Sequence, residues 1–370
     1  MRKLTNFHTV NHLRRVTGLL IILSVALMAP GLMLTRDVPF FPAFDFLAVS
    51  MQLNIAIGVL LVAALKFMIL RPSRTSGMMV LVSGITFIAL DLNRFHPLML
   101  NAVILLLLPD EDTEDQLRGI IISILLITYL FMTLNRINKT YLVSFEMLFF
   151  WFEQTKRHIK ELTLLITAFQ GLVVLSFVLF PSRYRVGAGF SVVVALLTEV
   201  ILIVVGADKQ SMVWNGLILY VSILLLTLPS GSYEVASFKQ RANQYAATAI
   251  VFLIATISFL GLLNKSFSYC TYSGRSESGL ILVRPEKIEF LPPAFKMSLL
   301  YLDSNPIIDV GYMMGLSYGQ TLYPDQRNIR QIASPLKNVS FDEQDVVLLL
   351  RVGEDIEIGK GIKPYLKSEF

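Results

Sequence analysis

The stretch Ala89-Leu90-Asp91-Leu92-Asn93-Arg94-Phe95-His96-Pro97 places an acid, an amide, a base and an imidazole between two apolar runs. Ionisable side chains are costly at membrane depth, and those that occur there usually serve a function. The stretch also decides the fold, because the flanking runs, 77–90 and 97–108, are short for a crossing of about 20 residues. They form either two short crossing helices or one crossing helix and one re-entrant segment.

The composition of the whole chain indicates a membrane protein. Of its 370 residues, 54% are hydrophobic and 16% are charged, against about 25% charged in a typical soluble domain. The net charge of +5 lies mostly in short loops beside apolar runs, which is typical of residues that set topology and contact lipid headgroups. We therefore expect the lipid bilayer as a partner and no nucleic acid. The chain has one cysteine and four histidines, and none of the histidines lies in an HExxH motif, which argues against a metal site.

Other apolar runs predict the remaining membrane crossings. They are 16–35, 47–70, 118–134, 162–181, 187–205, 211–228 and 246–264. Together with the two short runs they predict an all-α polytopic membrane helix bundle of about nine spans over residues 1–264. The run 16–35 follows two arginines and lacks a small-residue cleavage site, so we interpret it as a retained first span with a cytoplasmic N-terminus. If 97–108 does not cross, each later loop and the C-terminal region lie on the opposite side of the membrane. The distribution of basic residues in the loops fits the two topologies similarly well.

Two regions differ from this pattern. The stretch 139–160 packs aromatic residues between two basic ends, which is typical of a helix in the interface plane. It is either a plain amphipathic connector or one wall of a lateral entrance for a lipophilic molecule. Residues 265–370 carry many charges and short apolar runs at 279–284 and 346–352, which are typical of strands. We expect a small, β-rich, soluble C-terminal domain there, with a helix near 307–320.

The first candidate site is the opening stretch itself. Asp91 and Arg94 are three residues apart and can pair on one face of a helix. Arg94 stays charged, whereas His96 can change its charge near neutral pH and is a candidate acid or base. The alternative is a polar helix end at the headgroups, from which Arg94 snorkels.

The second candidate site closes the run 118–134 and contains Asn135, Arg136 and Lys139. With nine spans it lies on the same side as the first, and the two form one basic, amide-rich pocket. Such a pocket suits an anionic headgroup, a carboxylate or a quinone oxygen. The predicted ligand-binding residues are therefore Asp91, Arg94, His96, Asn135, Arg136 and Lys139, with a lipid or a quinone as ligand. The alternative is again a basic helix end.

Several of these phrases are similar to those of a known family. The opening stretch, the phrase Tyr129-x5-Asn135-Arg136-Ile-Asn138, and the tail phrases Tyr272-Ser273-Gly274 and Tyr323-Pro324 resemble bacterial HTTM membrane proteins. These are relatives of the vitamin K-dependent gamma-carboxylase and, more remotely, of DoxX-like proteins. The resemblance implies a bacterial inner-membrane protein, and with nine spans its C-terminal domain is periplasmic.

The resemblance departs from the carboxylase at one position. A lysine in the carboxylase phrase acts as the base that deprotonates vitamin K hydroquinone, and the matching residue here is Arg136. Arginine stays protonated in proteins and is a poor base. We therefore expect a non-carboxylating protein.

Three functions remain open at this point. The first is binding of a lipophilic or anionic ligand, or membership of a membrane complex with other membrane or periplasmic proteins. The second is an enzyme acting on a lipid-linked or quinone-type substrate, with His96 as acid or base. The third is a purely structural subunit that docks a partner through its C-terminal domain. The absence of a complete catalytic motif favours the first and the third.

Overall fold

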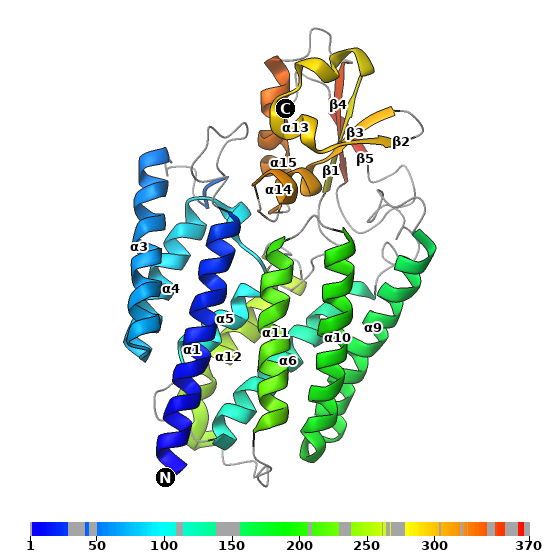
Figure 1. Cartoon of the computed structure of the whole chain (residues 1–370). Helices are drawn as coiled ribbons and strands as arrows, with labels where there is room; N and C mark the ends of the chain where they lie inside the picture. The colour runs from blue at the N-terminus through cyan, green and yellow to red at the C-terminus, as the bar shows by residue number, and fades with distance from the viewer. Residues whose placement is uncertain are drawn as a thin grey trace.

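The structure is a computed structural model of the chain (Figure 1). It describes residues 2–28, 41–43, 50–108, 114–137, 156–205, 209–228, 238–260, 262–263, 267, 278–302, 305–318, 320, 322–323, 325–338, 345–351 and 362–365. Lys139 and most of the predicted interfacial stretch 139–160 lie outside these ranges.

Helices of the described part of residues 1–260 pack together into one bundle (Figure 1). They are α1 (Arg2–Leu27), α3 (Met51–Leu70), α4 (Arg74–Ala89), α5 (Met99–Leu106), α6 (Glu114–Arg136), α9 (Lys156–Leu179), α10 (Tyr184–Val205), α11 (Lys209–Thr227) and α12 (Phe238–Phe259). Within the described ranges, 5 helices are long and apolar enough to cross a membrane: α1, α3, α6, α10 and α11. The apolar segments of α4, α9 and α12 are shorter, and α5 has only 8 residues. The prediction of a mostly helical bundle is confirmed, with five helices of spanning length.

The short runs flanking the opening stretch form α4 and α5, which lie side by side. Ser73 caps the start of α4: its hydroxyl accepts from the backbone N–H of Ser76, and the Ser76 hydroxyl accepts from the backbone N–H of Ser73. A Cβ atom on Gly77, near that start, would overlap the carbonyl oxygen of Leu106 at the end of α5. The segment 97–108 therefore runs back along α4, and Arg14 of α1 donates to the Leu108 carbonyl at its end.

The outside of the bundle is apolar and its interior holds many polar side chains. Val59 of α3, Val82 of α4 and Ile203 of α10 each expose more than 60% of their surface. By contrast, Arg14 and Arg94 are fully buried. Large apolar side chains are rarely left exposed in such numbers on a soluble protein, so this distribution fits a bundle whose outer surface contacts lipid.

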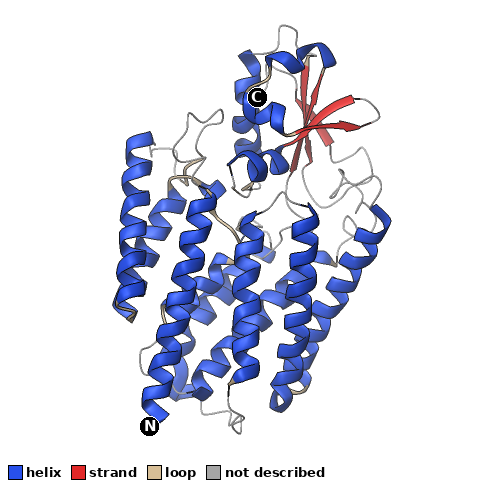
Figure 2. Cartoon of the chain, viewed as in Figure 1, coloured by secondary structure: helices blue, strands red, loops and turns tan. Residues whose placement is uncertain are grey.

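The C-terminal region is a separate layer of sheet and helices (Figure 2). Its antiparallel sheet has the order β2-β3-β1-β4-β5. The strands are β1 (Ser278–Val283), β2 (Leu299–Leu302), β3 (Asn305–Asp309), β4 (Val346–Arg351) and β5 (Ile362–Tyr365). The helices are α13 (Pro293–Met297), α14 (Val310–Tyr318) and α15 (Gln326–Ala333). The predicted strands near 279–284 and 346–352 and the predicted helix near 307–320 correspond to β1, β4 and α14.

One face of this sheet forms the core of the domain. Ile281 and Val283 of β1 and Leu348 of β4 point toward the helices and are buried with Phe295 of α13 and Ile329 of α15. The domain sits on the end of the bundle opposite the N-terminus (Figure 1). The stretch Asp91–His96 lies at that same end, between the bundle and the domain.

Candidate functional site

The turn after α4 is held by the carboxylate of Asp91. This residue is the N-cap of a short 3-10 helix, Leu92–Arg94, and its Oδ1 accepts from the backbone N–H of Asn93 at 3.2 Å. The same oxygen accepts from the Asn93 side chain at 3.1 Å and from the Phe41 N–H at 3.3 Å. An aspartate before a polar turn favours this geometry because its short side chain reaches the backbone donors that follow it.

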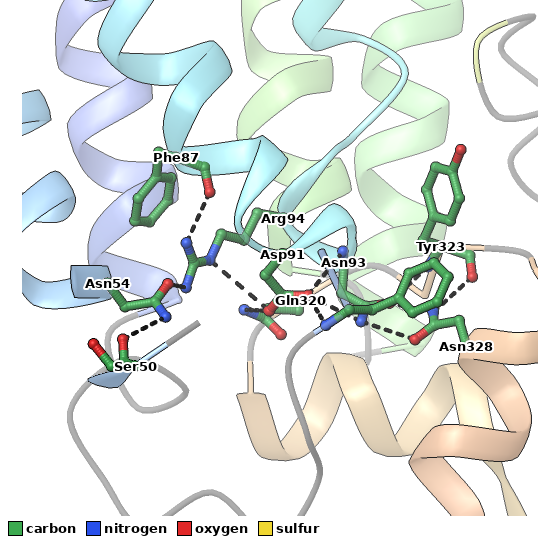
Figure 3. Close-up of polar contacts among 10 residues, drawn as sticks. Ser50, Asn54, Phe87, Asp91, Asn93, Arg94, Gln320, Tyr323 and Asn328 are labelled. Carbon is green, nitrogen blue, oxygen red and sulfur yellow. Dashed lines mark hydrogen bonds and ion pairs between the residues drawn. The ribbon is translucent and has the colours of Figure 1, made fainter. Parts of the chain in front are cut away.

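Arg94 is fully buried and is surrounded by fixed partners (Figure 3). Its Nη1 donates to the carbonyl of Phe87 at 2.8 Å, and its Nη2 donates to Asn54 Oδ1 at 2.5 Å. Its Nε lies 3.9 Å from Asp91 Oδ2, and the guanidinium lies 4.1 Å above the centroid of the Phe87 ring. The ion pair expected from the spacing of Asp91 and Arg94 is therefore present, in a 3-10 turn. A buried charge requires such partners. Because the partners of Arg94 come from α3, α4 and the turn, its side chain links these three elements.

Asn93 forms a reciprocal amide pair with Asn328 of α15 (Figure 3). Asn93 Nδ2 donates to Asn328 Oδ1 at 3.2 Å, and Asn328 Nδ2 donates to Asn93 Oδ1 at 2.7 Å. Asn93 Oδ1 also accepts from the backbone N–H of Tyr323 at 3.0 Å, and Asn328 Nδ2 also donates to the Tyr323 carbonyl at 2.8 Å. Both side chains are fully buried. The pair links the bundle to a domain that lies 235 residues later in the chain.

Two further contacts extend this joint between bundle and domain. Gln320 Nε2 lies 3.4 Å from Asp91 Oδ2 and donates to it. The ring of Tyr323 lies 6.1 Å from the ring of Phe41, centroid to centroid. Burial raises the pKa of Tyr323 to about 12, with a further rise from Asp325 and a partial offset from Arg327. We use the name joint for Asp91, Asn93, Gln320, Tyr323 and Asn328.

The position of Asn328 follows from the pattern of α15. Asp325 caps the helix by accepting from the N–H groups of Arg327 and Asn328 at 2.8 and 3.4 Å. The buried positions that follow are Asn328, Ile329, Ile332 and Ala333, which lie on one face at helical spacing. Asn328 is the polar member of an otherwise apolar face. Ile329 and Ile332 of this face pack in the domain core and so fix the orientation of α15, in which Asn328 contacts the bundle.

His96 lies outside the joint and has its own partner. Its Nε2 is 2.8 Å from Ser211 Oγ at the start of α11, and its Nδ1 accepts from the backbone N–H of Leu98 at 3.3 Å. Because Nδ1 is the acceptor, the neutral ring carries its proton on Nε2 and donates it to the serine. A general base needs the opposite arrangement, in which Nε2 accepts the hydroxyl proton. The geometry thus favours a structural role for His96.

The second predicted cluster lies at the end of α6. Asn135 is buried, and Arg136 Nη1 donates to Gln170 Oε1 of α9 at 3.2 Å. These contacts join α6 to α9, whereas Arg94 is bound by α3, α4 and the turn. The described hydrogen bonds of the two clusters have no residue in common, so they do not support one shared pocket. Lys139 lies outside the described ranges.

Several polar residues of these sites were not predicted from the sequence. Asn54 lies inside the apolar run 47–70, and Glu199 is the one charged residue of the run 187–205, so each is a polar residue at membrane depth and could have been found by that signal. Asn328 could have been found as an amide on the apolar face of a short helix. Gln320 and Ser211 carry no comparable signal, because only the tertiary structure brings them to their partners.

Two cavities of the described chain are lined without any charged residue. A groove of about 700 Å³ runs along the outside of α3 and α4, and its lining is apolar, including Ile57, Phe67 and Val82. Within the described ranges, no three His, Cys, Asp or Glu side chains gather where they could share a metal ion.

Comparison with known proteins adds no relative. No protein-family model, curated protein or solved structure matches the chain. The resemblance to HTTM proteins therefore stays a prediction based on the short motifs alone.

Proposed function

We propose that this protein is a membrane-embedded structural subunit that holds its C-terminal domain in one fixed orientation at the membrane surface and offers it to a partner protein. The observation that carries the proposal is the joint, in which Asp91 and Asn93 of the bundle form hydrogen bonds with Gln320, Tyr323 and Asn328 of the domain. Buried amides that satisfy each other fix one register, because any other orientation leaves them unpaired.

The same contacts argue against a ligand at this site. Arg94 is fully buried, and its guanidinium already binds the Phe87 carbonyl, the Asn54 amide and the Asp91 carboxylate. An anionic headgroup or quinone oxygen would have to displace these partners, and the displaced carboxylate would remain buried without its counter-charge. Such a loss is strongly unfavourable.

The proposed topology has nine membrane segments with the N-terminus in the cytoplasm. Its support is the alternating direction of the helices, including the return of 97–108 along α4, and the basic residues of the N-terminal segment. The short segment α5 is almost entirely buried, so longer helices would surround it where it crosses. The C-terminal domain would then lie in the periplasm if the membrane is the bacterial inner membrane.

The domain has apolar surface with which to bind a partner protein. Leu280 and Leu282 of β1 alternate with the core residues and point to the opposite face of the sheet, beside Leu349 and Val347 of β4. Three of the four are partly buried and Leu282 is 36% exposed. A cluster of aliphatic side chains on the second face of a sheet is typical of an interaction surface.

A photo-crosslinking experiment in native membranes tests this function. A benzophenone amino acid at Leu282 is expected to cross-link to one discrete protein, whereas the same group at Lys337, which is exposed elsewhere on the domain, is expected to give none. Adding Asn93→Ala is expected to weaken the Leu282 adduct, because the domain loses its orientation. Absence of a discrete adduct at Leu282, or equal adducts from both positions, contradicts the proposal.

Binding of an anionic lipid is a second candidate function, and it is favoured by the half-buried Arg136 at the end of α6. This arginine is held by Gln170 and is not enclosed as Arg94 is. If it binds headgroups, Arg136→Ala will reduce the enrichment of spin-labelled phosphatidylglycerol around the reconstituted protein. Arg327→Ala, at an exposed arginine of the domain, is the matched control. Equal enrichment in all three proteins contradicts this second function.

A further inference from the structure

Glu199 is a carboxylate inside an apolar helix. It belongs to Tyr184–Ile203, the part of α10 that is long enough to span a membrane. The helix continues to Val205, and at about 1.5 Å per residue Glu199 lies about 9 Å below that end. Charged side chains at such depth usually face the interior of a bundle and pair there, so their surroundings indicate their use.

One oxygen of Glu199 is held in place by α11. Asn215 is buried, and its Nδ2 donates to Glu199 Oε1 at 3.0 Å and to the carbonyl of Ala195 at 2.9 Å. Both amide hydrogens of Asn215 are thereby used, and the carboxylate is fixed against the seam between α10 and α11. Among the described residues, nothing forms a hydrogen bond or an ion pair with the second oxygen, Oε2. Asn215 therefore positions the carboxylate without neutralising it.

The surrounding face of α10 points away from the bundle. Leu196, Val200 and Ile203 expose 50%, 52% and 63% of their surface, and they lie three residues before, one after and four after Glu199. Glu199 itself is half-buried at the edge of this face. An apolar stripe with one fixed carboxylate at membrane depth is complementary to an apolar helix with one cation.

We propose that the outer face of α10 at Glu199 binds a transmembrane helix of a partner protein through a lysine or arginine at matching depth. Charge complementarity argues for a cation, because an anion facing hydrocarbon is costly unless it is paired. The depth argues for a helix: a lipid ammonium group stays at the headgroup level, whereas a side chain on a neighbouring helix can reach Oε2 at the depth of Glu199. This contact goes beyond the proposed docking of the C-terminal domain and does not depend on it.

The test uses the full chain in phosphatidylcholine vesicles and two model peptides. Each peptide is an apolar helix of about 22 residues; one carries a single arginine at the depth of Glu199, and the other carries leucine there. The chain has Cys270→Ser and Lys209→Cys, and association is measured by energy transfer from a dye at position 209. The arginine peptide is expected to bind about five- to thirtyfold more tightly than the leucine peptide. The Glu199→Gln variant is expected to lose this preference.

Matched controls separate the site from a general effect on folding. Glu199→Gln keeps an oxygen that can accept from Asn215, so the helix seam is retained, and binding of the leucine peptide should not change. Asn215→Ala should reduce the preference by leaving the carboxylate unpositioned. Equal binding of both peptides to the unchanged site overturns the proposal. So does Glu199-dependent energy transfer between two copies of the chain, or Glu199-dependent enrichment of spin-labelled phosphatidylethanolamine.

Discussion

The reciprocal amide pair of Asn93 and Asn328 allows the joint to be tested quantitatively. Asn93→Ala removes three hydrogen bonds to the domain, two with Asn328 and one from the Tyr323 N–H, and leaves buried polar atoms without partners. At about 1 kcal/mol for each buried bond, with more for each orphaned group, we expect docking to weaken by about 2–4 kcal/mol. Asn328→Ala removes the same pair and one bond to the Tyr323 carbonyl, and should cost about 2–3 kcal/mol.

The double variant gives the decisive value. Because the two residues share two hydrogen bonds, the second substitution should cost less than it does alone, with a coupling of about 1–3 kcal/mol. Docking is followed in detergent by energy transfer between dyes at Lys209→Cys and Lys337→Cys while urea is added. Asn305→Ala, at an exposed asparagine of the same domain, is the control and should cost no more than about 0.5 kcal/mol. Strictly additive losses, or a control loss as large as that of Asn93→Ala, would show that the two amides do not hold the domain as a pair.

Three further perturbations test other contacts. Gly77→Ala forces a methyl group onto the Leu106 carbonyl and should lower the thermal stability of the bundle by about 1–3 kcal/mol, whereas no loss would contradict the close approach of α4 and α5. Burial raises the pKa of Tyr323 from 10.0 to about 12. Docking of the domain should therefore hold below pH 10 and weaken between pH 10 and 12, because the phenol ionises at lower pH in the undocked state. Tyr323→Phe should abolish this part of the pH dependence of the energy transfer. Ser211→Ala removes the acceptor of His96 and should cost about 1–3 kcal/mol of stability, while His96→Gln, which keeps an N–H donor, should cost less in the same melting experiment.

Most of the fold could be predicted from the sequence because it depends on local patterns. Apolar runs of sufficient length predicted the helices, and short alternating runs predicted β1 and β4. The number of crossings could not be settled in this way, since the 8 residues of α5 are too few for a length criterion. The packing of Gly77 against Leu106 in the structure shows that 97–108 returns along α4.

The candidate site was predicted in part. The stretch Asp91–Arg94 stands out in the sequence because it places ionisable side chains between two apolar runs, where they are energetically costly. The spacing of Asp91 and Arg94 predicts their ion pair. The structural role of this stretch could not be predicted. Its hydrogen-bonding groups are occupied by Asn54, Gln320 and Asn328, which come from distant parts of the chain. A buried charge looks the same in a sequence whether it binds a ligand or joins two domains, and only its surroundings distinguish these roles.

The most direct test of the central claim is a distance distribution between the bundle and the C-terminal domain in lipid vesicles. Spin labels at Lys209→Cys and Lys337→Cys, in a chain with Cys270→Ser, can be measured by pulsed electron paramagnetic resonance. A fixed domain should give one narrow distribution for the otherwise unchanged chain and for Asn305→Ala, and a broad distribution is expected for Asn93→Ala. A broad distribution without the Asn93 substitution, or a narrow and unshifted one with it, would contradict a joint that fixes the domain.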